Sequence, residues 1–563
     1  MEKPWLKHYD AGVPHTVDYP EVPLHYFLEE SARKYPDNVA TVIQGGKLTY
    51  KELNQLTDRL AAALYDLGVR KGDRVALYLP NCPQYVIGFY AILKAGGVSV
   101  AVNPLYAPRE VVRQLNDCGA ETIIVLSKMY PLVKAIRAQT KLKNVIVTNI
   151  KEYFSPLIKI LFTLLKEAKD GHRVTLEEGD LWLQELLAHY TPEQRPEVEV
   201  GPDDRAIFQY TGGTSGVPKG AIGLHRNLVA NTLEICAFLP DMEEGKEVHL
   251  SAIPLFHVYG LVATMCSAVA VGASMIMIPN PRDLDDILKS IDKYKVTLYM
   301  GVPTMYLALC DHPDIAKYNV KSIKACISGS APLPLDVKRR FEELTSGKLV
   351  EGYGLSEAPT ASHCNPVYGR VVPGSIGLPL PDIEAKIVDL ETGTKDLPVG
   401  EIGELAIRGP IVMEGYWNMP EETALVLREG GWLLTGDIAK MDEDGYFYIV
   451  DRKKDMILCS GYNVYPRDVE EVLFEHPKVQ EAAVAGIPDP RRGETVKAWV
   501  VLKPGETASE KEIINFCRDK LARFKIPTAV EFRDELPKTM VGKVLRRYLR
   551  EEELKKQEGQ GEA

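Results

Sequence analysis

The chain lacks the patterns that mark several common classes of protein. Its nine cysteines are scattered singly, with no C-x-x-C pair and no metal-ligand spacing, which is typical of reduced thiols in the cytoplasm. No Gly-Lys-Ser/Thr sequence closes a Walker phosphate loop, and the dinucleotide pattern G-x-G-x-x-G is absent. The first ten residues are more charged than a signal peptide would be, so we expect none. A disulfide scaffold and the two best-known nucleotide loops are therefore excluded.

An excess of positive charge is absent as well. The chain has 67 Lys and Arg against 78 Asp and Glu, a net charge of −11. A polyanionic ligand must therefore be met by a local cationic cluster rather than by the overall field, and we do not expect nucleic-acid binding. A length of 563 residues with 45% hydrophobic content is sufficient for several domains with large cores.

One long stretch, residues 250–281, contains no Asp, Glu, Lys or Arg. On length alone it could span a bilayer. However, Pro254 and Pro279 bracket its apolar part, the interior is rich in Ala, Gly and Ser, and Ser274–Ile278 has the composition of a strand. We therefore favour a buried helix followed by a buried strand.

A second apolar segment, Tyr153–Leu165, contains a central lysine, Lys159, and is followed by Lys166. It is too short to span a membrane. Two interpretations remain open: a helix lying on a membrane surface, or a helix packed on the body of the protein.

Strand-like and helical patterns alternate along the first part of the chain. Residues 75–79, 122–126 and 144–148 have the composition of buried strands, and residues 50–67 and 84–95 have helical spacing. This alternation indicates an α/β fold with layered parallel sheets. From Gly374 to about Ile449, short strands separated by Gly, Pro and Asp-Gly turns predict a barrel-like or mixed-sheet subdomain.

The composition changes again after Asp451. Strands are expected at 482–487 and 496–502, a helix near 509–524, and a frayed, charged tail over 551–563. The predicted organisation is a large N-terminal domain of residues 1–450, with a barrel-like part over about 374–450, followed by a small α+β C-terminal domain of residues 451–550.

The segment Tyr210–Gly220 (Tyr-Thr-Gly-Gly-Thr-Ser-Gly-Val-Pro-Lys-Gly) is the strongest functional signal. It holds four glycines, three Ser/Thr hydroxyls and one lysine. A loop of this composition can wrap its backbone N–H groups and hydroxyls around phosphate oxygens. The sequence therefore predicts that the chain binds a nucleotide.

Five segments together resemble one family. They occur in the order and spacing of the AMP-forming acyl-CoA synthetases, and the likeness covers nearly the whole chain: residues 210–220, 351–357, 431–437, 451–466 and 537–543. The long-chain fatty-acyl-CoA synthetases of bacteria are the most similar group. The resemblance implies a ligase that joins a long-chain fatty acid to coenzyme A, using ATP and Mg²⁺, through an acyl-AMP intermediate with release of pyrophosphate and AMP.

The resemblance also implies the residues of the first half-reaction, in which a carboxylate attacks the α-phosphorus of ATP. Two anions approach each other in that step, so cations must offset their repulsion. Lys543 matches the family's adenylation lysine, and Glu357 matches its magnesium-linked glutamate, with Thr214 as a second metal contact.

The nucleotide site implied by the family has distinct parts. Tyr353 is expected to stack on adenine, Asp437 to accept hydrogen bonds from the ribose with Arg452 assisting, and Lys219 to steady the loop or the β/γ-phosphate oxygens. Ser215 and Ser356 stand where threonine is common in the family. The remaining nucleotide residues are Thr211, Gly212, Gly213, Gly216, Gly329, Glu351, Gly352, Gly354 and Lys454.

The second half-reaction is attack of the coenzyme A thiol on the acyl-adenylate. In the family, the C-terminal domain rotates about a hinge, a position that Asp451 occupies here. Ser460 and Gly461 are expected to line the coenzyme A channel, because glycine leaves room for passage, and Tyr462 and Asn463 to contact the adenylate or the channel.

His257 matches a histidine that borders the acyl pocket of the family, so the resemblance links it to acyl specificity. We group it with the predicted catalytic residues. A packed core histidine is an equally good interpretation. The apolar stretch after it would wall a tunnel for a hydrocarbon chain.

Several alternatives remain at this point. A medium-chain or aryl acid–CoA ligase would use the same machinery, a luciferase-type enzyme would oxidise the acyl-adenylate, and a non-catalytic scaffold would only bind nucleotide or acyl chains. We expect a cytoplasmic location. Peripheral contact with the inner face of the membrane and a homodimer are left open.

Overall fold

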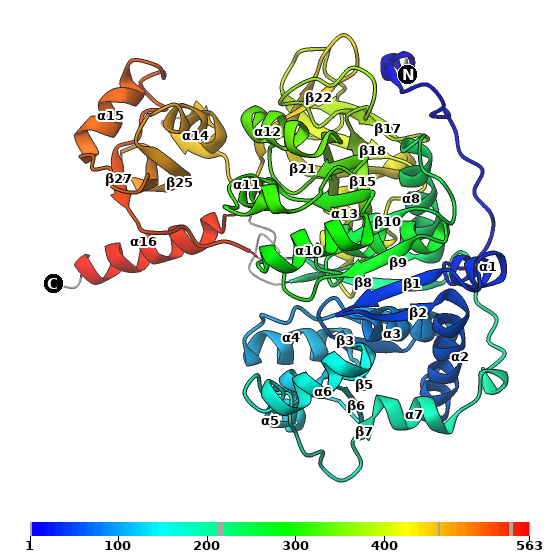
Figure 1. Ribbon diagram of the computed structural model, residues 1–563. Helices are drawn as coiled ribbons and strands as arrows, with labels where there is room; N and C mark the ends of the chain where they lie inside the picture. Colours follow the sequence, from blue (N-terminus) through cyan, green and yellow to red (C-terminus); the bar gives the residue numbers. More distant parts are fainter. Residues whose placement is uncertain (1–2, 212–217, 460–461, 490, 540–543, 562–563) are drawn as a thin grey trace. The chain divides into compact units, whose positions relative to one another are not determined.

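The structure, a computed structural model, describes residues 3–211, 218–459, 462–489, 491–539 and 544–561 (Figure 1). The chain separates into two compact units. The first comprises residues 1–384 and 407–433, and the second comprises residues 385–406 and 434–563. The domain boundary at residue 450 stays a prediction. The predicted fold class, mixed α/β with parallel sheets and a separate C-terminal part, is confirmed.

One sheet of the first unit has eight strands in the order β19-β9-β8-β4-β3-β5-β6-β7. The run from β8 to β7 is parallel, and β9 and then β19 join it through antiparallel pairs. The strands are β3 (Arg74–Tyr78), β4 (Val98–Ala101), β5 (Thr122–Leu126), β6 (Asn144–Thr148), β7 (Leu181–Trp182), β8 (Arg205–Thr211), β9 (Lys219–Leu224) and β19 (Gly415–Tyr416).

The other sheet has nine strands in the order β16-β15-β14-β13-β12-β10-β11-β1-β2. Its centre, from β14 to β1, is parallel, and both edges are antiparallel. The strands are β1 (Val39–Ile43), β2 (Gly46–Thr49), β10 (Val248–Ser251), β11 (Ser274–Met277), β12 (Leu298–Gly301), β13 (Ala325–Ser328), β14 (Lys348–Leu355), β15 (Ala358–Cys364) and β16 (Leu378–Pro379).

Helices cover these sheets and close two cores. Apolar residues of the eight-stranded sheet pack on α4 and α5, and those of the nine-stranded sheet pack on α10, α11 and α12. The α-helices of the first unit are α1 (Tyr26–Lys34), α2 (Tyr50–Asp66), α3 (Pro83–Lys94), α4 (Pro108–Cys118), α5 (Tyr130–Ile136), α6 (Pro156–Leu165), α7 (Leu183–His189), α8 (His225–Phe238), α9 (Ser267–Ala270), α10 (Leu284–Tyr294), α11 (Pro303–Cys310), α12 (Leu335–Thr345) and α13 (Pro420–Val426).

Shorter helical segments connect these elements. They are η1 (Pro4–His8), η2 (Ser127–Met129), η3 (Arg137–Gln139), η4 (Ile150–Tyr153), η5 (Pro192–Gln194), the π-helix η6 (Tyr259–Cys266), η7 (Ile315–Lys317) and η8 (Glu429–Gly431), and the strand β20 (Leu427–Arg428) precedes η8.

Local sequence explains where several elements begin. Thr49 caps α2 by accepting from the Glu52 N–H, and the Glu52 carboxylate accepts from the Thr49 N–H, which satisfies two free donors of the first turn. Pro83 starts α3, where a missing N–H costs nothing. The predicted strands 122–126 and 144–148 coincide with β5 and β6, because each is a run of β-branched and apolar residues buried in the sheet.

The uncharged stretch 250–281 forms buried structure, as predicted. Its helical part is η6 followed by α9, and the strand β11 ends it. Ser274 and Met277 are the first and last residues of that strand. Within the described residues, no helix is long and apolar enough to cross a membrane.

The second unit begins with β17 (Glu384–Val388) and β18 (Gly403–Arg408), which join β21 (Trp432–Met441) and β22 (Phe447–Arg452) in one sheet of short strands. A further sheet has the order β24-β23-β26-β25, with β27 on β26. These strands are β23 (Ile457–Cys459), β24 (Tyr462–Val464), β25 (Val479–Asp489), β26 (Gly493–Leu502) and β27 (Ala529–Phe532), accompanied by α14 (Pro466–Phe474) and α15 (Glu510–Arg518).

The C-terminal segment differs from the prediction. Residues 551–561, where we expect a frayed tail, continue the helix α16 (Arg546–Gly561). Ion pairs hold this helix to β26 and β27, since Glu553 pairs with Lys497 and Lys556 pairs with Glu531. The charges that suggested a solvated tail are therefore the groups that fix the helix.

Candidate active site

Most of the predicted residues of the first unit lie where strands of the nine-stranded sheet end. Strands β10, β12, β13 and β14 are parallel neighbours, so their carboxyl ends meet at one edge. His257 follows β10, Gly329 follows β13, and Glu351, Tyr353 and Gly354 belong to β14. Ligands of open parallel sheets bind at this kind of edge.

Close backbone contacts explain one predicted glycine. A Cβ atom at Gly354 would lie 1.4 Å from the carbonyl oxygen of Thr360 on β15, a distance that no side chain can adopt. The β14–β15 turn is therefore available only to a residue without a side chain at this position. Ser356 and Glu357 occupy the turn that follows.

His257 is half-buried and held by its own loop. Its Nδ1 accepts from the N–H of Tyr259 at 3.2 Å, and the Tyr259 hydroxyl contacts the carbonyl oxygens of Gly301 at 3.2 Å and Ile327 at 2.7 Å. Gln209 of β8 donates to the carbonyl of Phe256 at 3.2 Å. These contacts place His257 between the ends of β12 and β13 and the end of β8.

The glycine-rich loop is flanked by a fixed pair of strands. Thr211 ends β8 and pairs with Lys219, the first residue of β9. The predicted nucleotide residues between them lie outside the described part of the chain, namely Gly212, Gly213, Thr214, Ser215 and Gly216. Lys219 is buried, its ammonium forms an ion pair with Glu422 of α13, and it lies 5.0 Å from the centre of the Tyr416 ring.

Glu357 is positioned by the same neighbouring elements. The Tyr416 hydroxyl donates to Glu357 Oε1 at 2.8 Å, and the N–H of Met413 donates to the Glu357 carbonyl at 2.9 Å. Burial and the Glu357 carboxylate raise the pKa of Tyr416 well above its ordinary range, so the hydroxyl stays protonated and remains a donor. Tyr416 also pairs with Ala221 of β9, so the carboxylate and the glycine-rich loop are held by adjacent strands.

The sequence interpretation did not single out Tyr416 or Glu422. Both belong to the segment Gly415–Thr423, in which the Thr423 hydroxyl accepts from the Tyr416 N–H at 2.9 Å and donates to the Met419 carbonyl at 2.8 Å. The Pro-x-x-Thr sequence of this segment indicates a local turn. It does not indicate the contacts of Tyr416 with Glu357 and of Glu422 with Lys219, which join residues 59 and 203 positions apart in sequence.

Tyr353 and Glu351 have different surroundings. Tyr353 is half-buried and meets His363 edge-on with ring centres 5.9 Å apart. Burial lowers the pKa of His363 to about 3, so this neighbour is neutral. Glu351 is buried, and its Oε2 accepts from the N–H of Leu333 at 3.3 Å, in the loop after Gly329. Gly352 lies between them on β14.

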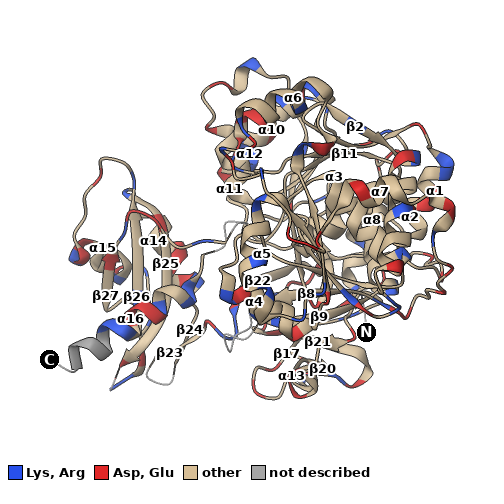
Figure 2. Cartoon of the chain, turned by 90° about the horizontal axis from the view of Figure 1, so that it is seen from below, with Lys and Arg blue, Asp and Glu red and all other residues tan. Residues whose placement is uncertain are grey.

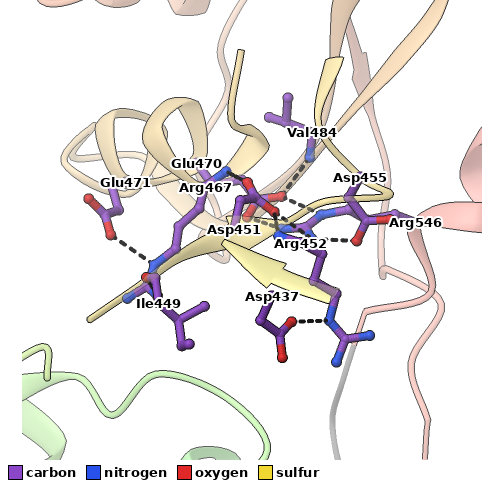
Figure 3. A network of polar contacts seen from close by, with 10 residues as sticks. All are labelled: Asp437, Ile449, Asp451, Arg452, Asp455, Arg467, Glu470, Glu471, Val484 and Arg546. Atoms are coloured by element: carbon purple, nitrogen blue, oxygen red, sulfur yellow. Dashed lines mark hydrogen bonds and ion pairs between the residues drawn. The ribbon is translucent and has the colours of Figure 1, made fainter. Parts of the chain in front are cut away.

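In the second unit, Asp437 and Arg452 are direct neighbours. They pair across β21 and β22, and Arg452 Nε lies 3.4 Å from Asp437 Oδ1 (Figure 3). Asp437 is buried apart from a small part of its surface, and Lys454 is exposed. The two residues expected to share the ribose site are thus brought together.

The predicted hinge residue, Asp451, is the centre of a polar network (Figure 3). Its Oδ1 accepts from the N–H of Arg452 at 2.7 Å, and its Oδ2 accepts from the N–H of Arg467 at 2.8 Å. Arg546 lies 3.9 Å from Asp451 and donates to Glu470 at 2.6 Å. Burial raises the pKa of Asp451 to about 6, although Arg546 and the two N–H groups oppose this shift.

Two of the four residues predicted to line the coenzyme A channel are described by the structure. Tyr462 and Asn463 belong to β24, both are exposed, and the Tyr462 ring stacks on Phe524 at 4.6 Å. Ser460 and Gly461, and the adenylation residue Lys543, lie outside the described residues.

Known proteins match this chain along nearly all of its length. Residues 28–417 match the model of the AMP-binding enzyme family, and residues 468–543 match that of the AMP-binding enzyme C-terminal domain. A Bacillus subtilis protein named long-chain-fatty-acid–CoA ligase is 47% identical over 559 residues, covering 98% of both chains. An Escherichia coli O6:H1 protein of the same name is 39% identical, with 98% of both chains covered.

Solved structures agree with this assignment. The crystal structure of ATP-bound MatB from Rhodopseudomonas palustris superimposes with a TM-score of 0.81 at 31% identity, covering 94% of this chain and 99% of that one. The glycine-rich loop between β8 and β9 and the Glu357 turn lie within the range 28–417, and the Asp437–Arg452 pair lies between the two matched ranges. The chain therefore belongs to the family of AMP-binding enzymes and, within it, to the AMP-forming acyl-CoA synthetases.

Proposed function

We propose that this chain is a long-chain-fatty-acid–CoA ligase, which converts a fatty acid, ATP and coenzyme A into acyl-CoA, AMP and pyrophosphate. The observation that carries the proposal is the 47% identity, over 98% of both chains, to a relative with that name. The site geometry supports it, because the strands that flank the glycine-rich loop, Glu357 and His257 border one region of the first unit.

In the first half-reaction, an oxygen of the fatty acid carboxylate attacks the α-phosphorus of ATP. The bond from that phosphorus to the bridging oxygen breaks, and pyrophosphate leaves with the electron pair. Lys543 supplies a cation between the two reacting anions, which stabilises the charge that builds on their oxygens. Hydroxyls of Thr211, Thr214 and Ser215 bind phosphate oxygens.

Lys219 fits a supporting role better than direct phosphate contact. Its pairing with Glu422 and its place over the Tyr416 ring hold the base of the loop at the start of β9. We assign it the task of steadying the loop, the first of the two roles that the sequence leaves open.

Magnesium fits the donor set. The described residues contain no group of three or more His, Cys, Asp or Glu that could hold a metal alone. Mg²⁺ in nucleotide sites needs only one or two protein ligands beside phosphate oxygens and waters. Glu357 is half-buried and its orientation is set by Tyr416, so Glu357 and Thr214 would hold the ion. The bound ion would offset negative charge on the phosphate oxygens.

The nucleoside is bound through its flat base and its sugar hydroxyls. Tyr353 stacks its ring on adenine, and Gly329 contributes backbone near the base. The neighbouring nucleotide residues are Glu351, Gly352, Gly354 and Ser356. Asp437 accepts from the ribose hydroxyls, while Arg452, already 3.4 Å away, fixes the carboxylate. Lys454, which is exposed, is assigned to the phosphate side by the family resemblance.

In the second half-reaction, the coenzyme A thiolate attacks the acyl carbonyl carbon. The bond between that carbon and the phosphate oxygen breaks, and AMP leaves. Rotation about Asp451 would exchange the lysine-bearing surface for the β23–β24 hairpin, so that Gly461 and Ser460 line the path of the thiol, with Tyr462 and Asn463 beside it. On the C-terminal side of this hinge, the backbone N–H groups of Arg452 and Arg467 donate to the Asp451 carboxylate.

Acyl selection is assigned to the region around His257. The residues that follow it, from Tyr259 to Cys266, are uncharged and mostly apolar. Each methylene buried in an apolar tunnel contributes roughly 0.8 kcal/mol, so tunnel length would set the preferred chain length. A homodimer remains a separate prediction, which sedimentation velocity tests.

Pyrophosphate release tests the function directly. Purified protein is given ATP, Mg²⁺ and fatty acids of increasing length, with and without coenzyme A. A ligase of long-chain acids releases the most pyrophosphate with long acids and forms thioester only with coenzyme A. A preference for medium-chain or aryl acids would replace the substrate assignment, and oxygen uptake without coenzyme A would indicate luciferase-type oxidation.

Substitution of Lys543 tests the assigned chemistry. Lys543→Ala removes the cation from the adenylation step, so acyl-AMP formation should fall by about a thousandfold. Thioester formation from supplied acyl-AMP should stay within a few-fold of wild type. Equal loss in both assays would contradict the assignment of Lys543 to the first step alone.

A further inference from the structure

Helix α6 turns its most apolar side toward solvent. Five aliphatic side chains are exposed at the spacing i, i+3, i+4, i+7 and i+8, which defines one face of a helix. They are Leu157 (67% exposed), Ile160 (58%), Leu161 (42%), Leu164 (74%) and Leu165 (69%). We call this set the α6 apolar face. A helix on a protein surface normally turns its apolar stripe inward, so this orientation is the reverse of the usual one.

The other side of α6 is anchored to the protein. The Phe162 ring meets the rings of Phe154 at 5.5 Å and His172 at 5.6 Å. Lys151 donates to the Thr163 hydroxyl at 3.0 Å. Aromatic and polar contacts therefore fix the rotation of the helix, and the apolar face is a consequence of the fold rather than of a loose segment.

The segment that contains and follows α6 carries more basic than acidic residues. Lys166, Lys169 and Arg173 follow the helix and are exposed. Two nearby carboxylates are already paired, Glu152 with Lys159 at 2.6 Å and Glu167 with Lys151 at 2.6 Å and with Arg173 at 3.7 Å. Residues 151–173 contain five Lys/Arg and three Asp/Glu, a net charge of +2 in a chain of net charge −11. Figure 2 shows α6 at the edge of the first unit with lysine and arginine close by.

We propose that α6 docks on the surface of an anionic lipid bilayer, with the α6 apolar face inserted at the boundary between headgroups and acyl chains. An exposed apolar face beside basic residues is the pattern of a helix that lies in the membrane interface. Lys166, Lys169 and Arg173 would contact lipid phosphates. The absence of a membrane-spanning helix in the described residues is compatible with a helix that lies on the surface.

A second copy of the chain fits this surface less well. A symmetric α6–α6 contact would bring the three basic residues of one copy close to those of the other, and like charges oppose such a contact. It would also bury little area, because α6 has only 10 residues. The charge pattern therefore favours an anionic partner.

The inference rests on α6 alone and does not depend on the ligase activity. If the proposed activity is correct, the two are connected, because long-chain fatty acids dissolve in bilayers. A ligase held at the interface would meet its acyl substrate there.

Vesicle binding tests the proposal. The full-length protein is sedimented with phosphatidylcholine vesicles that contain or lack phosphatidylglycerol, without ATP or fatty acid. The variant Leu157→Gln/Leu164→Gln/Leu165→Gln should bind anionic vesicles about a hundredfold more weakly. The matched control Leu105→Gln/Val399→Gln/Ile402→Gln changes three other exposed aliphatic residues and should bind as wild type does.

A second variant separates charge from insertion. Lys166→Gln/Lys169→Gln/Arg173→Gln should lose about fivefold in binding for each basic residue on anionic vesicles and little on neutral ones. All variants should retain pyrophosphate release with a fatty acid in detergent micelles, so failure of this proposal is distinguishable from failure of the proposed function. Wild-type protein that does not sediment with anionic vesicles would overturn the proposal. A dimer that the leucine substitutions convert to monomer, without vesicle binding, would assign the face to a second copy.

Discussion

The two units compensate their buried carboxyl groups in different ways. In the first unit, Glu234 of α8 is fully buried and contacts the amide of Asn231 at 3.0 Å and the hydroxyl of Tyr19 at 3.1 Å. That hydroxyl also lies 2.7 Å from Asp382 Oδ2. In the second unit, Arg546 lies among Glu470, Asp455 and Asp451.

The pKa values follow from these surroundings. Burial raises the pKa of Glu234 to about 8, and Asp382 adds to the shift, so Glu234 carries a proton at neutral pH. The Tyr19 hydroxyl can then donate its single proton to Asp382, while the protonated Glu234 donates to the Tyr19 hydroxyl oxygen. Burial raises the pKa of Asp451 only to about 6, because Arg546 and backbone N–H groups lower it. A proton thus compensates the first cluster, and a guanidinium compensates the second, at the proposed hinge.

Removal of the guanidinium should have the largest effect on stability. Arg546→Met leaves three carboxyl groups without their cation, and we expect the second unit to lose about 3 kcal/mol. Because the pKa of Asp451 should then rise further, the loss should be smaller at pH 5 than at pH 7. Hydrogen exchange, resolved by segment over residues 434–563, measures the change.

A neighbouring arginine provides the control for this experiment. Arg547 is exposed and pairs with Glu551 one turn away, so Arg547→Met should cost less than about 0.5 kcal/mol. Equal losses in the two variants would show that Arg546 does not compensate a buried cluster.

A substitution in the first unit tests compensation by a proton. Since the folded-state pKa of Glu234 is raised, the stability that this group contributes is full below about pH 4.5 and is lost as the pH rises through 8. Relative to Glu234→Gln, wild type should lose about 3 kcal/mol between pH 4.5 and pH 7. Hydrogen exchange of residues 225–238 at several pH values measures this difference.

The glutamine variant keeps an amide in place of the protonated acid, so it should retain both contacts at every pH. A difference between the two proteins that does not vary with pH would show that Glu234 is ionised in the folded state.

Glu357 is a third kind of carboxylate, because a neutral hydroxyl, that of Tyr416, orients it. Tyr416→Phe removes the 2.8 Å hydrogen bond to Glu357, at a cost of about 1 kcal/mol, and should slow acyl-AMP formation about tenfold. Because Tyr416 acts through the proposed metal ligand, the Mg²⁺ concentration for half-maximal rate should rise. Pyrophosphate release over a Mg²⁺ series measures both.

The matched control is Tyr448→Phe. It removes a hydroxyl that donates to Asp442 at the same distance, 2.8 Å, in a turn of the second unit. It should leave the rate and the Mg²⁺ dependence unchanged. A loss of rate in Tyr416→Phe with unchanged Mg²⁺ dependence would argue against a positioning role.

Local patterns were sufficient for much of the fold. The strands at 122–126 and 144–148 are runs of apolar, mostly β-branched residues, and their boundaries follow from composition alone. The capping pair Thr49 and Glu52 indicates the start of helix α2. The helix expected near 509–524 is shorter than predicted, since α15 spans only Glu510–Arg518.

The supporting contacts of the site could not be predicted in this way. Tyr416 and Glu422 meet Glu357 and Lys219 only because β19 pairs with β9, and no periodicity in the sequence encodes that pairing. The direction in which α6 faces was also undecided, since hydropathy identifies an apolar face but not what covers it. The ring contacts of Phe162 with Phe154 and His172 show which side of the helix faces the protein.

The second unit is assembled from two separated parts of the chain, residues 385–406 and 434–563. During synthesis, its first segment leaves the ribosome before the strands that complete its sheet exist. Residues 407–433, which carry Tyr416 and Glu422, must therefore join the first unit while the chain on either side awaits its partners. A protein cut at residue 450 would separate β17, β18 and β21 from the rest of their unit. Division of this chain into functional fragments must therefore take account of all three points at which the chain passes from one unit to the other.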